Sequence, residues 1–198
     1  RWYWTWSTEE WDCVGDPPAT WPDYILACDP DGWSGNYPVA YWDEAWKDTV
    51  IYGKHTGSGS DPDRNYNSVI DEVIKDGFDG IYLDWVEAFE YSDVVAAAQA
   101  AGKDPAGEMI AFLPELRNYA PARNPDFIII QQNAASLIDG HPELTGVIDA
   151  IAQEAIWYDG EADVDWSDSR GYDQSPAEEP DGVTSYLNQY LNGGLPVF

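Results

Sequence analysis

Four short apolar runs, separated by segments with helical spacing, constrain the fold of this chain more than any other feature. The runs lie at 78–83, 127–130, 146–152 and 195–198. Strands that alternate with helices form a parallel sheet, and continuous apolar runs indicate strands that are buried on both faces. The sequence therefore predicts an α/β fold in which helices cover a parallel sheet.

The segments around these runs carry helix signals. Apolar residues at helical spacing, alanine-rich stretches and terminal glycines predict helices at 41–53, 65–77, 92–101, 105–119, 134–138 and 183–191. Residues 1–53 are rich in Trp, Pro, Gly and Asp, which indicates an aromatic-rich loop region, and 54–63 is expected to be a flexible linker or a loop tip. Regular β/α units occupy 64–198, so we expect a single domain over 1–198.

Polar residues close the first three runs. Asp84 follows the first run, Gln132 and Asn133 follow the second, and Gln153 and Glu154 follow the third. Enzymes built on parallel barrels place their chemistry at this carboxyl edge, so we expect a fold of the (β/α)8 TIM-barrel type. Such a barrel has eight strands and typically about 250 residues. With four strand candidates, we expect it to be incomplete in this chain, with N-terminal strands and the last strand missing.

Asp84 and Glu154 are the candidate catalytic pair. Neighbouring strands lie about 5 Å apart, so these side chains would lie two strands apart, across a gap near that of a glycosidase pair. One carboxylate of such a pair stays ionised and the other donates a proton. Most of the 37 acids in this chain are expected on a solvated surface. Asp84 and Glu154 differ because they follow buried strands.

Other polar and aromatic residues near the same edge are candidates for binding a sugar. An amide can hold a sugar hydroxyl, and an aromatic ring can stack on a sugar ring. The candidates are Trp85, Glu87, Glu90, Gln132, Asn133, Trp157 and Tyr158. For Glu87 and Glu90 two interpretations stay open, a place in the pocket and a place on an exposed loop.

The net charge excludes several partners. The 37 Asp and Glu residues outnumber nine Lys and Arg residues, for a formal net charge of -28. Such a chain repels nucleic-acid phosphates and anionic membrane surfaces. No apolar run reaches the roughly 18 residues of a membrane-spanning helix. Either a cationic substrate or adaptation to high salt explains the charge. The acids are spread along the whole chain, which favours a halophilic protein, and we expect it at the cell surface or secreted.

The cysteines and histidines give weaker signals. Cys13 and Cys28 leave a disulfide and two free thiols as alternatives. The histidines are His55 and His141, and nothing in the sequence has the spacing of metal ligands. We therefore expect neither a metal nor a cofactor, and the sequence indicates no particular oligomeric state.

Four segments resemble the barrels of glycoside hydrolase family 114, the endo-α-1,4-polygalactosaminidases and their relatives. The segments are WSGNYPVAYWDEAW (33–46), GFDGIYLDWVEAFEY (77–91), FIIIQQN (127–133) and IDAIAQEAIWY (148–158). The resemblance covers residues 30–198 and implies a glycosidase that cleaves α-linked galactosamine-type polysaccharide.

The same resemblance implies roles for single residues. Asp84 matches the acid that ends the family's GIYLD motif and is the expected nucleophile, and Glu154 is the expected general acid/base. Glu87 stands where the family usually has Asp, and Ala134 stands where it often has Gly. These departures and the missing strands leave an alternative open, a non-catalytic carbohydrate-binding or surface protein that retains the barrel fold.

Overall fold

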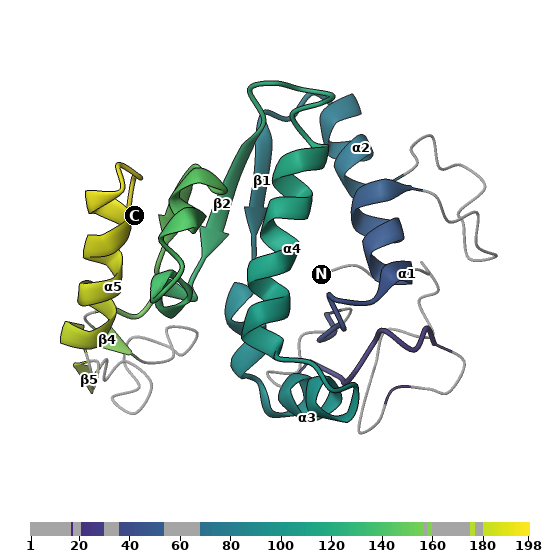
Figure 1. The fold of residues 1–198 in the computed structure, drawn as a ribbon, viewed down its shortest axis with the longest axis horizontal. Helices are drawn as coiled ribbons and strands as arrows, with labels where there is room; N and C mark the ends of the chain where they lie inside the picture. The colour runs from purple at the N-terminus through teal and green to yellow at the C-terminus, as the bar shows by residue number, and fades with distance from the viewer. Residues whose placement is uncertain are drawn as a thin grey trace, which may run out of the picture.

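The computed structural model describes residues 17, 21–29, 36–53, 68–156, 158–159, 175–176 and 180–198. Only the backbone is described at 158–159, 175–176 and 180–181. Within these residues, helices pack beside a parallel sheet of three strands in the order β1–β2–β3 (Figure 1). The predicted α/β class and the parallel sheet are confirmed.

The strands lie where the apolar runs predict them. They are β1 (Gly80–Leu83), β2 (Ile128–Gln132) and β3 (Ala150–Ala152). Gly80 is in register with Ile128, and Ile130 is in register with Ala150. The fourth run contributes a single parallel bridge between Val197 and Ile151. The carboxyl ends of all three strands therefore reach the same edge of the sheet.

The third strand is shorter than the predicted 146–152. Pro142–Gly146 forms the 3-10 helix η4, and the N–H groups of Val147 and Ile148 donate to the Leu144 carbonyl at 2.9 and 3.2 Å. The carboxylate of Asp149 then accepts the Ile129 N–H at 2.7 Å. Because these groups are already bonded, strand pairing to β2 begins only at Ala150.

Helices lie close to every predicted helical segment. They are α1 (Glu44–Lys47), which continues as the π-helix η1 (Asp48–Tyr52), α2 (Val69–Lys75), the 3-10 helix η2 (Val86–Glu90), α3 (Ser92–Ala100), α4 (Pro105–Tyr119), the 3-10 helix η3 (Ala135–Ile138) and α5 (Pro180–Asn192). The side chains of Asp43, Ser68 and Asp104 cap α1, α2 and α4 by accepting backbone N–H groups. A short antiparallel pair joins β4 (Tyr158–Asp159) to β5 (Ser175–Pro176).

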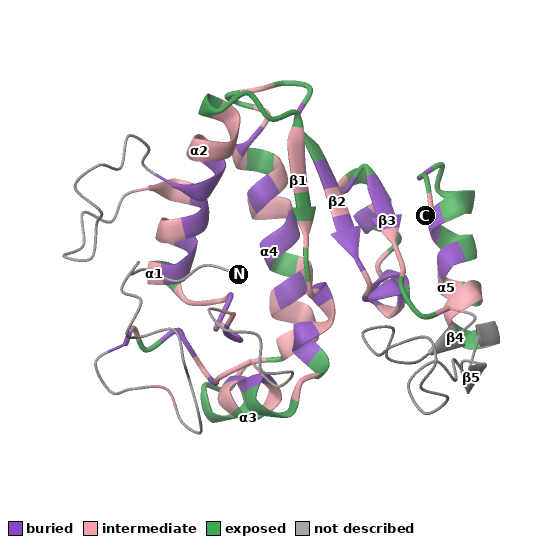
Figure 2. Cartoon of the chain, turned by 180° about the vertical axis from the view of Figure 1, so that it is seen from behind, coloured by how far each residue is buried: buried purple, intermediate pink, exposed green. Residues whose placement is uncertain are grey.

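The two faces of the sheet differ in burial. Ile129 and Ile151 face the helices and are fully buried in a single apolar core. On the opposite face, Tyr82 is 51% exposed and Ile128 is 42% exposed (Figure 2). The prediction that both faces are buried is therefore wrong here. Three strands and one bridge do not close into a barrel within the described residues, which leaves this face of β1 and the start of β2 partly exposed.

Arg117 of α4 links this helix to the sheet through hydrogen bonds and an ion pair. Its guanidinium donates to the Val147 carbonyl at 2.6 Å and to the Phe127 carbonyl at 3.0 Å, and it forms an ion pair with Asp149. The planar fork of an arginine satisfies several acceptors at once. One side chain thus holds α4, the start of β2 and the approach to β3 together.

Candidate active site

Three strand ends converge at the carboxyl edge of the sheet. Asp84 follows β1, Asn133 follows β2, and Glu154 lies two residues beyond β3. The strand order places Asp84 and Glu154 two strands apart, as predicted. Both side chains are exposed, and both line one cavity of about 670 Å³. This volume is within the range of ligand pockets, which is about 300–1,000 Å³.

The chain turns sharply where each strand ends. Trp85 (φ 60°), Asn133 (φ 58°), Ala134 (φ 57°) and Ala155 (φ 52°) all have left-handed backbones. Such conformations in residues other than glycine cost of order 1–3 kcal/mol each and cluster at functional sites. Their position directly after three neighbouring strands supports the prediction that this edge is the functional one.

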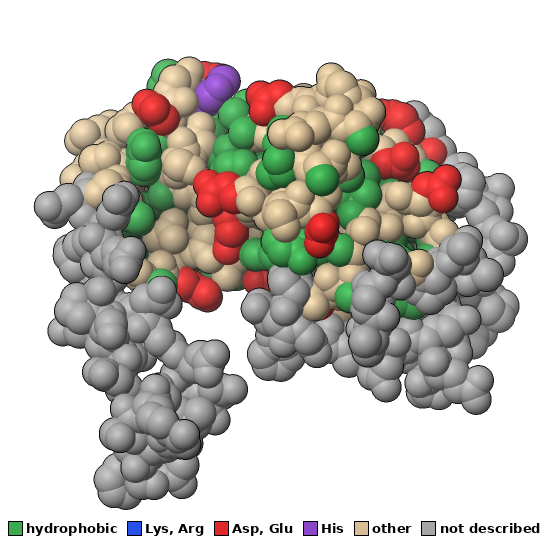
Figure 3. Space-filling model, turned by 90° about the horizontal axis from the view of Figure 1, so that it is seen from below, with side chains coloured by type: hydrophobic (Ala, Val, Ile, Leu, Met, Phe, Trp, Pro, Cys, Tyr) green, Lys and Arg blue, Asp and Glu red, His purple; other side chains and the backbone are tan. Residues whose placement is uncertain are grey.

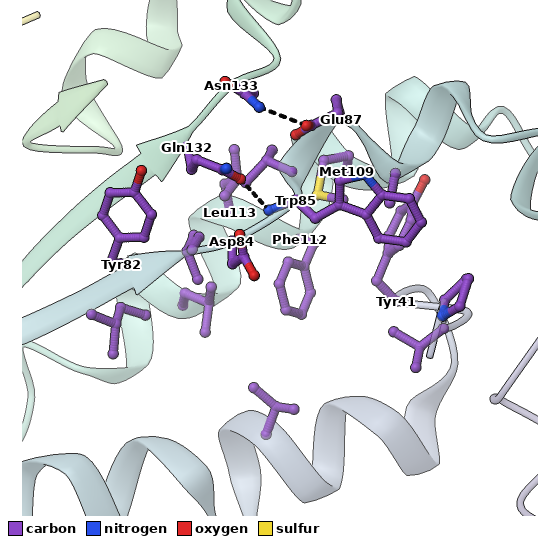
Figure 4. Close-up of a pocket in the computed structure, with 18 of the residues that line it drawn as sticks. Tyr41, Tyr82, Asp84, Trp85, Glu87, Met109, Phe112, Leu113, Gln132 and Asn133 are labelled. Carbon is purple, nitrogen blue, oxygen red and sulfur yellow. Dashed lines mark hydrogen bonds between the residues drawn. The ribbon is translucent and has the colours of Figure 1, made fainter. Parts of the chain in front are cut away.

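The turn after β1 is held from β2. The Trp85 N–H donates to the Gln132 Oε1 atom at 2.5 Å, across 47 residues of sequence. Trp85 is the residue directly before η2, and η2 carries Glu87, which lies beside Asn133 (Figure 4). The Trp85 ring packs against Tyr91, with ring centroids 5.5 Å apart.

Asn133 connects the three strand ends through its side-chain amide. Its Nδ2 atom donates to the Glu87 Oε1 atom at 2.7 Å, as Figure 4 shows. Its Oδ1 atom accepts the Glu154 backbone N–H at 2.8 Å and the Gln153 Nε2–H at 3.1 Å. The Asn133 N–H donates to the Ala152 carbonyl at 2.7 Å. Gln132 and Asn133, predicted to bind sugar, line the cavity. Their side chains also form hydrogen bonds with Trp85 and Glu87, which follow β1.

Glu87 is the carboxylate most affected by its surroundings. Burial raises the pKa of its carboxyl group, the hydrogen bond from Asn133 opposes this, and the charges of Asp84 and Glu154 raise it further. Its Oε2 atom is buried and has no hydrogen-bond partner among the described residues. The pKa of Tyr82, which is half exposed, is raised by its partial burial and by the charges of Glu154, Asp84 and Glu87. The three carboxyl groups therefore share one electrostatic environment.

The charges at the strand ends are those of acids. The ion pairs of Lys47, Lys103, Arg117 and Arg123 involve other acids, which are Glu115, Glu108, Asp149 and Asp71. Figure 3 views the molecule from the side toward which β1 and β2 run. On this face, acidic side chains are visible and no described lysine or arginine is. The described part of the cavity mouth is therefore negatively charged.

The other predicted site residues have different positions. Trp85 and Glu87 line the cavity, whereas Glu90 is exposed and is absent from its lining. Trp157 lies outside the described residues, and Tyr158 is described only by its backbone, in β4. The part of the chain that the structure describes holds no group of three or more His, Cys, Asp or Glu side chains placed to bind a metal.

Several cavity residues were not predicted. Tyr82 lies in β1, two residues before Asp84. Alternate residues of a strand point to the same side, so this spacing could have predicted that Tyr82 lines the cavity with Asp84. Asp29, Asn36 and Tyr37 line the cavity from the aromatic-rich N-terminal region. The sequence did not predict that these residues line the cavity, because the sequence around them lacks the apolar spacing of a helix or a strand. The abundance of aromatic residues in 1–53 was the one indication of a binding role.

A cavity lined by carboxylates at the carboxyl edge of a parallel sheet is the arrangement of α/β enzymes. Within this class, the chain belongs to glycoside hydrolase family GH114, whose family model matches residues 7–198. The resemblance noted from the four sequence segments is thereby confirmed.

Similar proteins support the family and the fold. Uncharacterized proteins of Deinococcus radiodurans and Thermotoga maritima are 36% and 32% identical to it over 136 and 164 residues. These alignments cover 69% and 80% of this chain, but only 36% and 41% of the relatives. The glycoside hydrolase domain of PelA from Pseudomonas aeruginosa has a similar fold, with a TM-score of 0.59 and 18% identity. That match covers 88% of this chain and 55% of the PelA domain.

Proposed function

We propose that this chain hydrolyses glycosidic bonds in a polysaccharide, with Asp84 as nucleophile and Glu154 as general acid/base. The observation that carries the proposal is that these carboxylates line one cavity from strand ends two strands apart. Asp84 attacks the anomeric carbon while Glu154 protonates the leaving oxygen. Glu154 then removes a proton from water, which attacks the same carbon and releases Asp84.

The proposed substrate is an α-linked galactosamine-type polymer that carries free amino groups. Three carboxyl groups, those of Asp84, Glu87 and Glu154, line one cavity and act on one another's charge. A protonated amino sugar would bring a positive charge to these carboxyl groups. Glu87 lines the cavity beside Asp84, so its carboxyl group would attract such an ammonium group.

The proposal extends to the fold and the location of the protein. We propose that the described strands are part of a (β/α)8-type barrel, a suggestion supported by the likeness to the PelA domain.

Cys28 is disulfide-bonded, and the other cysteine of the chain, Cys13, lies outside the described residues. Disulfides persist in oxidising compartments, which supports a secreted or cell-surface protein. No helix in the described ranges has the length and apolar character needed to cross a bilayer.

The test is the release of reducing ends from galactosamine polymers, with acetylated and deacetylated substrates compared in high salt. We expect Asp84→Asn and Glu154→Gln each to lower kcat by at least about 100-fold, because each removes a group that acts in the reaction. Glu143→Gln is the matched control, since Glu143 is exposed and does not line the cavity. Hydrolysis that survives both Asp84→Asn and Glu154→Gln rules out the assignment.

The same experiment separates the enzyme from a non-catalytic protein. Binding of the polymer by the wild-type chain without any release of reducing ends favours the carbohydrate-binding alternative. A preference for acetylated over deacetylated polymer overturns the proposed role of the ammonium group and leaves the hydrolase assignment intact.

A further inference from the structure

We infer that Glu87 is a positioning residue, which orients Asn133 so that Asn133 fixes the backbone of Glu154. This inference rests on the proposed role of Glu154 as the general acid/base. This role is separate from the proposed attraction of an ammonium group, because it depends on the Oε1 atom, which accepts the Asn133 Nδ2–H at 2.7 Å.

The orientation of the Asn133 amide follows from the bonds on its two sides. A side-chain amide has donors on nitrogen and an acceptor on oxygen, so each partner dictates which end faces it. Glu87 is a carboxylate that accepts the Nδ2 hydrogen, which turns Oδ1 toward the Glu154 N–H at 2.8 Å. Without an acceptor at residue 87, this arrangement loses its charge-assisted bond, which is the stronger kind.

The direction of the Glu154 side chain depends on this backbone bond. Glu154 is followed by Ala155 at φ 52°, so its backbone lies at the start of a sharp turn and outside β3. Pairing with β2 ends at Ala152. Beyond it, the Gln153 N–H donates to the Phe198 carbonyl at 3.0 Å, and the bond to Asn133 holds the Glu154 N–H that follows. A displacement of about 1 Å at a reacting group can lower the rate by about 100-fold.

The decisive experiment reverses the polarity of the Glu87–Asn133 bond. Asn133→Asp places two carboxylates where the bond was, so we expect kcat to fall by at least about 100-fold with little change in KM. In the double variant Glu87→Gln/Asn133→Asp, the new glutamine donates to the new aspartate, which still accepts the Glu154 N–H. The double variant moves the charge and keeps the bonds. We expect it to recover kcat to within about tenfold of wild type.

Two single variants of Glu87 separate positioning from charge. Glu87→Leu removes the acceptor and the charge, whereas Glu87→Gln removes only the charge. We expect Glu87→Leu to lower kcat by at least about 100-fold and Glu87→Gln by less than about tenfold, because the amide oxygen still accepts the Asn133 hydrogen. Equal losses in both variants would overturn the inference, and so would a double variant no more active than Asn133→Asp.

Amide hydrogen exchange provides a readout that needs no catalysis. We expect Glu87→Leu to accelerate exchange of the Glu154 N–H by tenfold or more, and Glu143→Gln to leave it unchanged. If the wild type hydrolyses no polymer but the Glu154 amide responds to residue 87, the proposed function fails and the positioning stands. An exchange rate that is the same in Glu87→Leu and wild type overturns the positioning, whatever the activity.

Discussion

At the scale of single residues, the ionised Glu87 carboxyl group is expected to lower the free energy of unfolding, although it is bonded to Asn133 in the candidate site. Burial and the neighbouring carboxylates raise the pKa of Glu87 in the folded chain above its ordinary value. The folded state therefore holds this proton more tightly than the unfolded state. This contribution is complete below the ordinary pKa and is lost as the pH rises through the raised one. Ionising this carboxyl group therefore costs more in the folded chain than in the unfolded chain.

Glu87→Gln is therefore expected to raise the melting temperature at pH 7. The gain over wild type should shrink as the pH falls below about 4, where an ordinary glutamate is protonated in the unfolded chain as well. Thermal unfolding followed by circular dichroism at both pH values measures this. The control is Glu143→Gln. The exposed Glu143 has a pKa that is lowered by its hydrogen bond with His141, so its removal is expected to give no gain in melting temperature. A gain in Glu87→Gln that is equal at both pH values contradicts the explanation.

At the scale of elements, the close approach of β1 to β2 depends on a missing side chain. A Cβ atom at Gly80 would lie 2.2 Å from the Ile128 carbonyl oxygen, which belongs to the neighbouring strand in register. Gly80→Ala is expected to lower the free energy of unfolding by about 2–3 kcal/mol, because the strands must separate to admit the methyl group. Gly146→Ala is the control, since a Cβ atom there meets nothing within 4 Å. Equal denaturation midpoints for the two variants would contradict the argument.

Local signals predicted the elements, and distant contacts decided the turns between them. Helix α4 was predictable at 105–119 because Asp104, Pro105 and the apolar spacing all lie within the segment. Helix η2 was not predictable, because it begins where the Trp85 N–H meets the Gln132 side chain, 47 residues away. The convergence of Asp84 and Glu154 followed from strand order alone. The hydrogen bonds of Asn133 with Glu87 and Glu154 could not be predicted in this way, because they depend on the conformation of the turns after the strands.

At the scale of the whole molecule, the net charge of -28 sets the conditions under which the chain folds. Repulsion among exposed acids acts over a Debye length of about 30 Å at 0.01 M salt and of about 3 Å at 1 M. The chain has nine lysines and arginines for 37 Asp and Glu residues, so the acids greatly outnumber the cations that could pair with them. Screening by salt therefore has to replace the charge compensation that the chain lacks.

We expect the melting temperature to rise by more than about 10 °C between dilute buffer and molar potassium chloride, because salt screens the repulsion among the acids. In a chain of this size, each kcal/mol added to the free energy of unfolding raises the melting temperature by about 2–4 °C.

Replacing the exposed Asp76, Asp93 and Asp126 with Asn is expected to lower the salt concentration needed for folding, because fewer acids then repel one another. Sucrose is the control for general stabilisation, which acts without screening charge. Cooperative unfolding at the same temperature in dilute buffer and in molar salt would show that packing alone outweighs the repulsion.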